Sequence, residues 1–176
     1  FCGSGTIPIE AALIAKNRAP GLDRRFAAQK WKSLPSKLWL DAAEEAQDKE
    51  FHGQYDIWGG DIDPACVELS RHNAELAGVE DCVRFQVADA GKFHRDSPYG
   101  QLVTNPPYGQ RLMDEESVRS LCRDFGRVYR QIPPKWRVLV LSSRADFAED
   151  FGRRAGKKRK PSNGLLRCAP YPFQRG

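Results

Sequence analysis

The side chains with the clearest chemical potential lie in the loop Thr104-Asn105-Pro106-Pro107-Tyr108-Gly109, which follows a short apolar segment. Two prolines stiffen this loop and lack N–H donors, so it presents mainly acceptors. The side-chain oxygen of Asn105 and the carbonyl oxygen of Pro106 can accept both hydrogens of an exocyclic amine. The nitrogen lone pair then turns towards an electrophile such as a sulfonium methyl group. Tyr108 offers a flat face for an extruded base. We therefore predict catalytic roles for Asn105, Pro106 and Tyr108, against the simpler interpretation of an ordinary turn.

A second candidate is the opening segment Phe1-Cys2-Gly3-Ser4-Gly5-Thr6, which directly precedes an apolar, helix-forming stretch. Glycines allow the backbone to approach a ligand closely, and a helix N-terminus offers unpaired N–H groups to an anion such as the methionine carboxylate. We predict cofactor contacts from Cys2, Gly3 and Gly5. A plain tight turn explains the same residues, because short glycine motifs occur often by chance.

Acidic residues follow the next two predicted strands. Asp61, in Gly60-Asp61-Ile62-Asp63, can accept hydrogen bonds from two ribose hydroxyls, while Ile62 lies against an adenine ring and Asp63 caps the following helix. Asp89 can accept a hydrogen bond from the adenine amino group. We predict that Asp61, Ile62 and Asp89 bind the cofactor together with Asn105. The alternative is that the aspartates are only helix caps or solvated turn residues.

The elements that must position these residues alternate between helix and strand. We predict helices over residues 7–15, 37–49, 63–77 and 115–131, strands over 55–60, 83–87, 101–104 and 137–142, and a hairpin near Asn163-Gly164. This order predicts an α/β fold of the Rossmann-like class I methyltransferase type, with a mostly parallel sheet and a closing antiparallel hairpin. A glycine loop in such a sheet follows a strand. We therefore expect residues 1–176 to form one methyltransferase domain whose first strand is missing.

Composition narrows the class of protein. The chain is 40% hydrophobic and 29% charged, has a formal net charge of +5, and contains no apolar run of membrane-spanning length. Its five cysteines are scattered without a C-x-x-C pair, which favours a reducing cytoplasm. The three histidines lack ligand spacing, so we predict no metal site. The four tryptophans, including Trp31 and Trp136, are expected in the core.

The basic run Lys157-Lys158-Arg159-Lys160 has two interpretations. Lysines on an edge strand commonly protect a sheet against aggregation, and strand alternation would send these charges to both faces. We favour that solvated edge over phosphate contact. Arg111, just after the proline loop, together with Pro107 and Tyr108, is the better candidate for binding substrate.

Taken together, the motifs resemble those of the bacterial THUMP-containing RNA methyltransferases. The resemblance rests on the segments Cys2–Thr6 with Ile9–Ala12, Arg18–Leu22 and Asn105–Arg111, and it extends over the whole chain. Within that family the chain is most similar to the 23S ribosomal RNA guanine-N2 methyltransferases. The resemblance implies S-adenosylmethionine as methyl donor, the guanine N2 amine as acceptor, 23S rRNA as partner and a THUMP region upstream.

Two family features are absent from these residues, namely an Asp-Pro pair before the glycine motif and the THUMP region. We therefore expect little or no activity from this chain alone. The Asn-Pro-Pro-Tyr loop also serves methylation of adenine N6 in DNA and of protein glutamine, so these remain alternatives. A non-catalytic RNA-binding fragment is a further alternative of a different class.

Overall fold

The chain alternates helices and strands, as expected, and the computed structural model describes residues 1–106, 115–142, 147–152, 162–163, 166–167 and 169–174. No helix in these ranges is both long and apolar enough to span a bilayer. The helices are α1 (Thr6–Ala15), α2 (Ser36–Asp48), α3 (Pro64–Leu76), α4 (Glu115–Tyr129) and α5 (Phe147–Asp150), with short 3-10 turns η1 (Ala27–Lys30) and η2 (Ala90–Lys92). The strands are β1 (Ile57–Asp61), β2 (Val83–Val87), β3 (Tyr99–Thr104), β4 (Lys135–Ser142), β5 (Ser162–Asn163), β6 (Leu166–Arg167) and β7 (Ala169–Gln174).

The strands pair mostly in parallel, which confirms the predicted fold class. β1 lies parallel to β2, with Asp61 opposite Val87 at their carboxyl ends. β3 lies parallel to β4, and β7 pairs antiparallel with the other edge of β4. β5 and β6 form the predicted antiparallel hairpin. The strand that closes the larger sheet is therefore β7, which comes after the hairpin.

The sheet is divided between β1 and β3. In the described residues β1 pairs only with β2, and β3 only with β4. A cavity of about 820 Å³ separates the two halves, and residues of both β1 and β3 line it. The candidate site lies at the end of this cavity where β1, β2 and β3 have their carboxyl ends.

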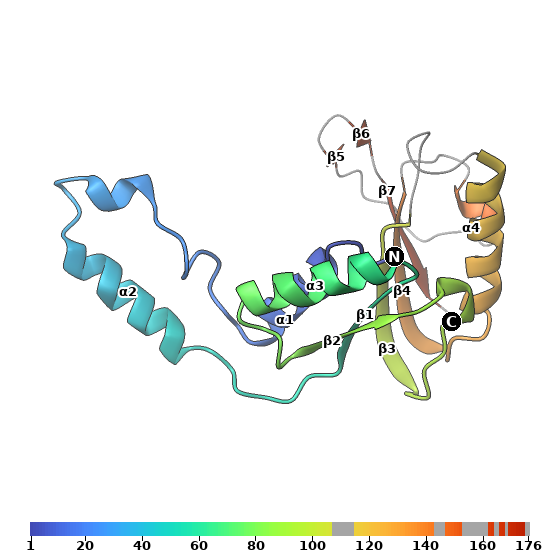
Figure 1. Ribbon diagram of the computed structural model, residues 1–176, viewed down its shortest axis with the longest axis horizontal. Coiled ribbons are helices and arrows are strands. Elements are labelled where there is room, and N and C mark those ends of the chain that lie inside the picture. The colour runs from blue at the N-terminus through green and yellow to red at the C-terminus, as the bar shows by residue number, and fades with distance from the viewer. Residues whose placement is uncertain (107–114, 143–146, 153–161, 164–165, 168, 175–176) are drawn as a thin grey trace.

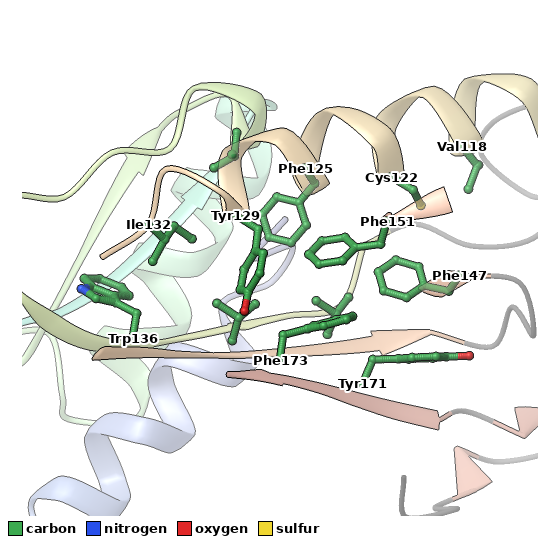
Figure 2. Packing of buried hydrophobic residues seen from close by; sticks show 13 residues of the cluster. Val118, Cys122, Phe125, Tyr129, Ile132, Trp136, Phe147, Phe151, Tyr171 and Phe173 are labelled. Carbon is green, nitrogen blue, oxygen red and sulfur yellow. The ribbon is translucent and has the colours of Figure 1, made fainter. Parts of the chain in front are cut away.

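Each half of the sheet has its own apolar core. α1 and α3 pack on β1 and β2 through residues such as Ala12, Val67 and Phe85. α4, α5, β4 and β7 enclose a second, aromatic cluster, shown in Figure 2. In that cluster the rings of Phe151 and Phe173 stack with centroids 4.3 Å apart. A ring contact between Phe1 and Phe125 of α4, at 6.4 Å, joins the glycine loop to the second core.

Residues 22–48, which we call the arm, project away from both sheets between α1 and β1 (Figure 1). α2 forms most of the returning part of the arm and buries none of its residues. The prediction that all four tryptophans are core residues is wrong for Trp31, which is 61% exposed because the arm carries it away from the sheets. The prediction is confirmed for Trp136 of β4, which is buried with its ring against Gly100 of β3.

Candidate active site

The glycine loop is built on two residues with left-handed backbone. Gly3 has φ +56° and Gly5 has φ +80°, a region that L-residues with side chains rarely adopt. Gly5 is the N-cap of α1, and a Cβ atom there would lie 2.9 Å from the Cβ of Ser70 and 3.1 Å from the Phe85 ring. A Cβ at Gly3 would meet nothing within 4 Å. Gly5 is therefore required for packing, whereas the backbone at Gly3 is open to a ligand.

The loop is joined to the end of β1 by Asp61. Its Oδ2 accepts a hydrogen bond from the Gly3 N–H at 2.9 Å, and its Oδ1 accepts one from the Asp63 N–H at 3.2 Å. The Cys2 N–H also donates to the carbonyl of Gly60, at 3.0 Å. The structure thus brings together Cys2, Gly3 and Asp61, three residues that the sequence predicted as cofactor contacts.

The environment of Asp61 favours its charged form. The residue is 9% exposed, and burial alone raises the pKa of the carboxyl group. The backbone N–H groups of Gly3 and Asp63, together with the positive charge of the Phe1 amino group 3.8 Å away, outweigh burial, so the pKa of Asp61 lies below its ordinary value. A carboxylate has about four acceptor positions, and two backbone donors leave some of these for a ligand hydroxyl.

Two polar residues of α3 hold the glycine loop through hydrogen bonds to its carbonyl groups. The Ser70 hydroxyl donates to the carbonyl of Gly3 at 2.9 Å, and the Asn73 amide donates to the carbonyl of Ser4 at 2.8 Å. Sequence reasoning missed both residues. Their spacing of three positions on one helix face was the available signal, since such residues can reach a common neighbour.

Ile62 and Asp89 follow the carboxyl ends of β1 and β2. Ile62 is 67% exposed, directly after β1, so its side chain is available to cover an aromatic ring. Asp89 follows β2 and lines the cavity between the two sheets together with Cys2 and Gly60. Its Oδ1 caps η2 by accepting from the Gly91 N–H at 2.8 Å, which leaves Oδ2 for another donor. The predicted cap role of Asp63 is confirmed by its bond from the Ala65 N–H.

The proline loop begins at the carboxyl end of β3. Thr104, the last residue of β3, is buried and lines the same cavity as Cys2 and Asp89. Asn105 follows it and is exposed, and Pro106 is buried. The predicted substrate contacts Pro107, Tyr108 and Arg111, and the basic run 157–160, lie outside the described residues.

The glycine loop, Asp61 and Ile62 have the chemistry needed to bind the carboxylate, the ribose and the adenine of S-adenosylmethionine. A helix N-terminus with an open glycine backbone fits a carboxylate. Asp61 fits a ribose diol, and the exposed Ile62 fits an adenine face. The cavity beside them is bounded by Phe1, Ala88 and Thr104, so a cofactor bound along the loop would meet the start of the proline loop.

Comparison with known proteins agrees with this arrangement. The family model of the RMKL-like methyltransferase domain matches residues 1–171. The chain is 38% identical over 174 residues to "Putative RNA methyltransferase YpsC" of Bacillus subtilis strain 168, a match that covers 98% of this chain and 45% of that protein. It is also 38% identical to "Ribosomal RNA large subunit methyltransferase K/L" of Shewanella baltica strain OS185, covering 96% of this chain and 24% of that protein. The chain thus spans less than half the length of these relatives.

Solved structures described as methyltransferases have the same fold. SMU.472, described as "a putative methyltransferase complexed with SAH", superposes with a TM-score of 0.95 at 38% identity, covering 99% of this chain and 46% of that one. A "predicted N6-adenine-specific DNA methylase" of Listeria monocytogenes str. 4b F2365 superposes with a TM-score of 0.91 at 43% identity, covering 99% and 45%.

SAH is what remains of S-adenosylmethionine after methyl transfer, so the cofactor is S-adenosylmethionine. The parallel strand pairs, the glycine loop bound to Asp61 and the match over residues 1–171 lead to one assignment. The chain belongs to the RMKL-like methyltransferase-domain family.

Proposed function

We propose that this chain forms the methyl-transfer centre of an enzyme that modifies the N2 amine of a guanine in 23S ribosomal RNA. The observation that carries the proposal is the position of Asn105-Pro106. These two residues directly follow Thr104, the last residue of β3, and Thr104 lines the same cavity as Cys2 and Asp89. An amine bound by the proline loop would therefore lie next to a cofactor bound by the glycine loop.

The cofactor supplies an electrophilic methyl group, and the chain's own residues fix where that group lies. In this proposal Gly3 and Gly5 let the loop pass close to the methionine end at the N-terminus of α1, while their own N–H groups donate to Asp61 and to the Cys2 carbonyl. Asp61 accepts from the ribose hydroxyls and keeps its charge because its pKa is lowered. Ile62 covers the adenine, and Asp89 accepts from the adenine amino group through the oxygen that η2 does not use.

The substrate amine is oriented by acceptors. Asn105 Oδ1 and the Pro106 carbonyl each accept one N–H of the amine, so the nitrogen lone pair points at the methyl group. Asn105 is also proposed to contact the cofactor. Such positioning contributes rate without a metal or a covalent intermediate. Tyr108 and Pro107 are proposed to stack on the base, and Arg111 to contact the RNA backbone nearby.

The RNA substrate is supported by the relatives. The Shewanella protein is named as a large-subunit ribosomal RNA methyltransferase, and the Bacillus protein as an RNA methyltransferase. Because this chain matches less than half of each, we propose that an upstream THUMP region in the parent protein helps to grip the RNA. A ribosomal substrate would place the enzyme in the cytoplasm, as the scattered cysteines lead us to expect.

Adenine N6 methylation of DNA is the main competing reaction. Adenine and glutamine also carry an NH2 group with two hydrogens, so the acceptors of Asn105 and Pro106 do not distinguish them from guanine. The name of the Listeria neighbour supports the adenine alternative.

Methylation with labelled S-adenosylmethionine decides between these substrates. Protein-free 23S rRNA, duplex DNA and a glutamine-containing peptide are offered in parallel to the full polypeptide, and labelled RNA is digested to nucleosides. We expect label only in 23S rRNA, recovered as N2-methylguanosine. Label confined to DNA or peptide, or to methyladenosine, would overturn the proposal. Cofactor binding without transfer to any substrate would favour the non-catalytic alternative.

A matched pair of amide substitutions tests the role of Asn105. Asn105→Ala removes the acceptor, and we expect the methylation rate to fall about 100-fold or more, as for other positioned polar groups. Gln54→Ala removes an exposed amide before β1, far from the carboxyl end of the strand, and should leave the rate unchanged. An equal effect of both changes would show that Asn105 does not act on the amine.

A further inference from the structure

The arm, residues 22–48, is a fixed part of the fold because its base is clamped. The Phe51 N–H donates to the Lys16 carbonyl at 2.7 Å. The Asn17 amide donates to the Lys49 carbonyl at 3.0 Å. These bonds join the residues just before the arm to those just after it, so the arm leaves and re-enters the body at one place.

The two limbs of the arm are also joined to each other. Phe26 in the outgoing limb stacks on Trp39 of α2, with ring centroids 6.0 Å apart and planes 17° apart. Close to the base, Arg18 bridges Asp23 of the outgoing limb and Glu50 after the returning limb, each at 2.9 Å. The arm is therefore held together as one unit, although α2 buries no residue.

This unit exposes large apolar side chains. Trp31 is 61% exposed, Leu38 54% and Leu40 69%. Leu38 and Leu40 are two positions apart on a helix, so they point to different sides of it. A helix of 13 residues with no buried residue has little stability of its own in water, because packing supplies most helical stability. A surface that covers the arm must therefore contact more than one side of α2.

Charge on the arm is separated by limb. The outgoing limb, taken as residues 22–37 so that it includes the first two residues of α2, has one acid and five basic side chains. No described residue forms an ion pair with these basic side chains, which are Arg24, Arg25, Lys30, Lys32 and Lys37. The returning limb, residues 38–48, has no basic residue and four acids, which are Asp41, Glu44, Glu45 and Asp48. The limbs thus carry formal net charges of opposite sign and equal size.

We propose that the arm is a dimerisation element that pairs with the arm of a second copy of this chain. In a two-fold interface each contact occurs twice, so an arrangement with the basic limb of one copy on the acidic limb of the other makes two attractive contacts. The exposed Trp31, Leu38 and Leu40 form the apolar centre, and the charges form its rim. An RNA partner fits less well, because the returning limb of the same unit carries four carboxylates, which would repel a phosphate backbone.

Charge-reversed variants of the full polypeptide test this pairing. One variant reverses the basic limb with Lys30→Glu, Lys32→Glu and Lys37→Glu. The other reverses the acidic limb with Asp41→Lys, Glu44→Lys and Asp48→Lys. Sedimentation equilibrium over a range of concentrations measures the dimer dissociation constant. We expect the wild type to dimerise and each variant alone to show a dissociation constant raised at least about tenfold, since six rim pairs become repulsive.

Mixing the two variants gives the decisive result. One variant then has two acidic limbs and the other two basic limbs, so both contacts of a mixed pair are attractive, and we expect a heterodimer of near wild-type affinity. Reversal of three exposed acids outside the arm (Glu68→Lys, Glu75→Lys and Glu80→Lys) is the control and should leave dimerisation unchanged.

Three results would overturn the proposal. They are a monomeric wild type at every concentration, variants that fail to associate when mixed, and a dimer that survives both reversals. Loss of RNA affinity in the basic-limb variant, with no change in its oligomeric state, would assign the arm to RNA instead. Unchanged thermal unfolding of each variant separates loss of pairing from loss of folding.

Discussion

The N–H of Gly3 donates a hydrogen bond to Oδ2 of Asp61 at 2.9 Å, and this bond joins the glycine loop to the carboxyl end of β1. The two residues are 58 positions apart in the sequence. One carboxylate therefore has two tasks, because it fixes the loop that would receive the methionine end of the cofactor and it is the proposed acceptor for the ribose. Changes at Asp61 should affect cofactor affinity and loop stability together.

Asp61→Asn should weaken cofactor binding. The amide keeps the size of the carboxyl group but loses its charge, and its NH2 side cannot accept from the Gly3 or Asp63 N–H groups. Hydrogen bonds to charged groups contribute about 1.5–3 kcal/mol, so we expect affinity for S-adenosylmethionine to fall about 10- to 100-fold. Isothermal titration calorimetry measures this directly.

Asp63→Asn is the matched control. Asp63 caps α3 by accepting from the Ala65 N–H, and asparagine caps helices about as well as aspartate. Cofactor affinity should therefore stay near the wild-type value. If both substitutions weakened binding equally, general damage to the turn after β1 would explain the result, and the ribose contact assigned to Asp61 would lose its support.

The stability contributed by Asp61 should depend on pH in one direction. Its pKa in the folded chain is lowered, because the N–H donors of Gly3 and Asp63 and the charge of the Phe1 amino group together outweigh burial. A lowered folded pKa means that the contribution is complete above the unfolded pKa, about 4 for aspartate, and is lost as pH falls through the folded value. Urea unfolding of wild type and Asp61→Asn should show a constant difference from pH 7 to 5 and a shrinking one below about pH 4. A difference that grew as pH fell would contradict this assignment.

The cofactor side of the site could be predicted from sequence because its signals are local. Asp63-Pro64 marks the start of α3, and the strand over 83–87 agrees with its observed bounds. Once strands and helix starts are located, the parallel arrangement places their connecting loops at one edge. The supporting bonds from Ser70 and Asn73 could not be predicted with equal ease, since they depend on how α3 lies against the loop.

The arm and β7 show where sequence patterns were insufficient. Trp31 was expected in the core because aromatic residues are usually buried, but hydrophobicity does not reveal that a segment leaves the body of the protein. β7 contains Pro170 and Pro172, which normally argue against a strand. They are tolerated because β7 pairs only with β4 among the described strands, while Tyr171 and Phe173 between them are buried.

Gly5→Ala should destabilise the fold more than Gly3→Ala. Both residues have left-handed backbone, for which a residue with a side chain loses about 1–2 kcal/mol. At Gly5 the new Cβ would also lie 2.9 Å from Ser70 and 3.1 Å from Phe85, and overpacking of this kind costs about 1–3 kcal/mol. We expect losses of about 2–5 kcal/mol at Gly5 and about 1–2 kcal/mol at Gly3, measured by urea unfolding. Equal losses would show that Ser70 and Phe85 move aside freely.

Gly126→Ala tests how closely α4 approaches the turn after α5. Alanine in a helix is favoured over glycine by about 1 kcal/mol, so propensity alone predicts stabilisation. The new Cβ would lie 2.3 Å from the Phe151 carbonyl oxygen, a backbone atom that cannot rotate away. The Phe151 ring stacks on Phe173 at 4.3 Å and is almost fully buried, which resists a shift of that backbone. We therefore expect the clash to outweigh propensity, with a net loss of about 1–3 kcal/mol in the free energy of unfolding. An increase in that free energy would mean that α4 separates from Phe151 at no cost.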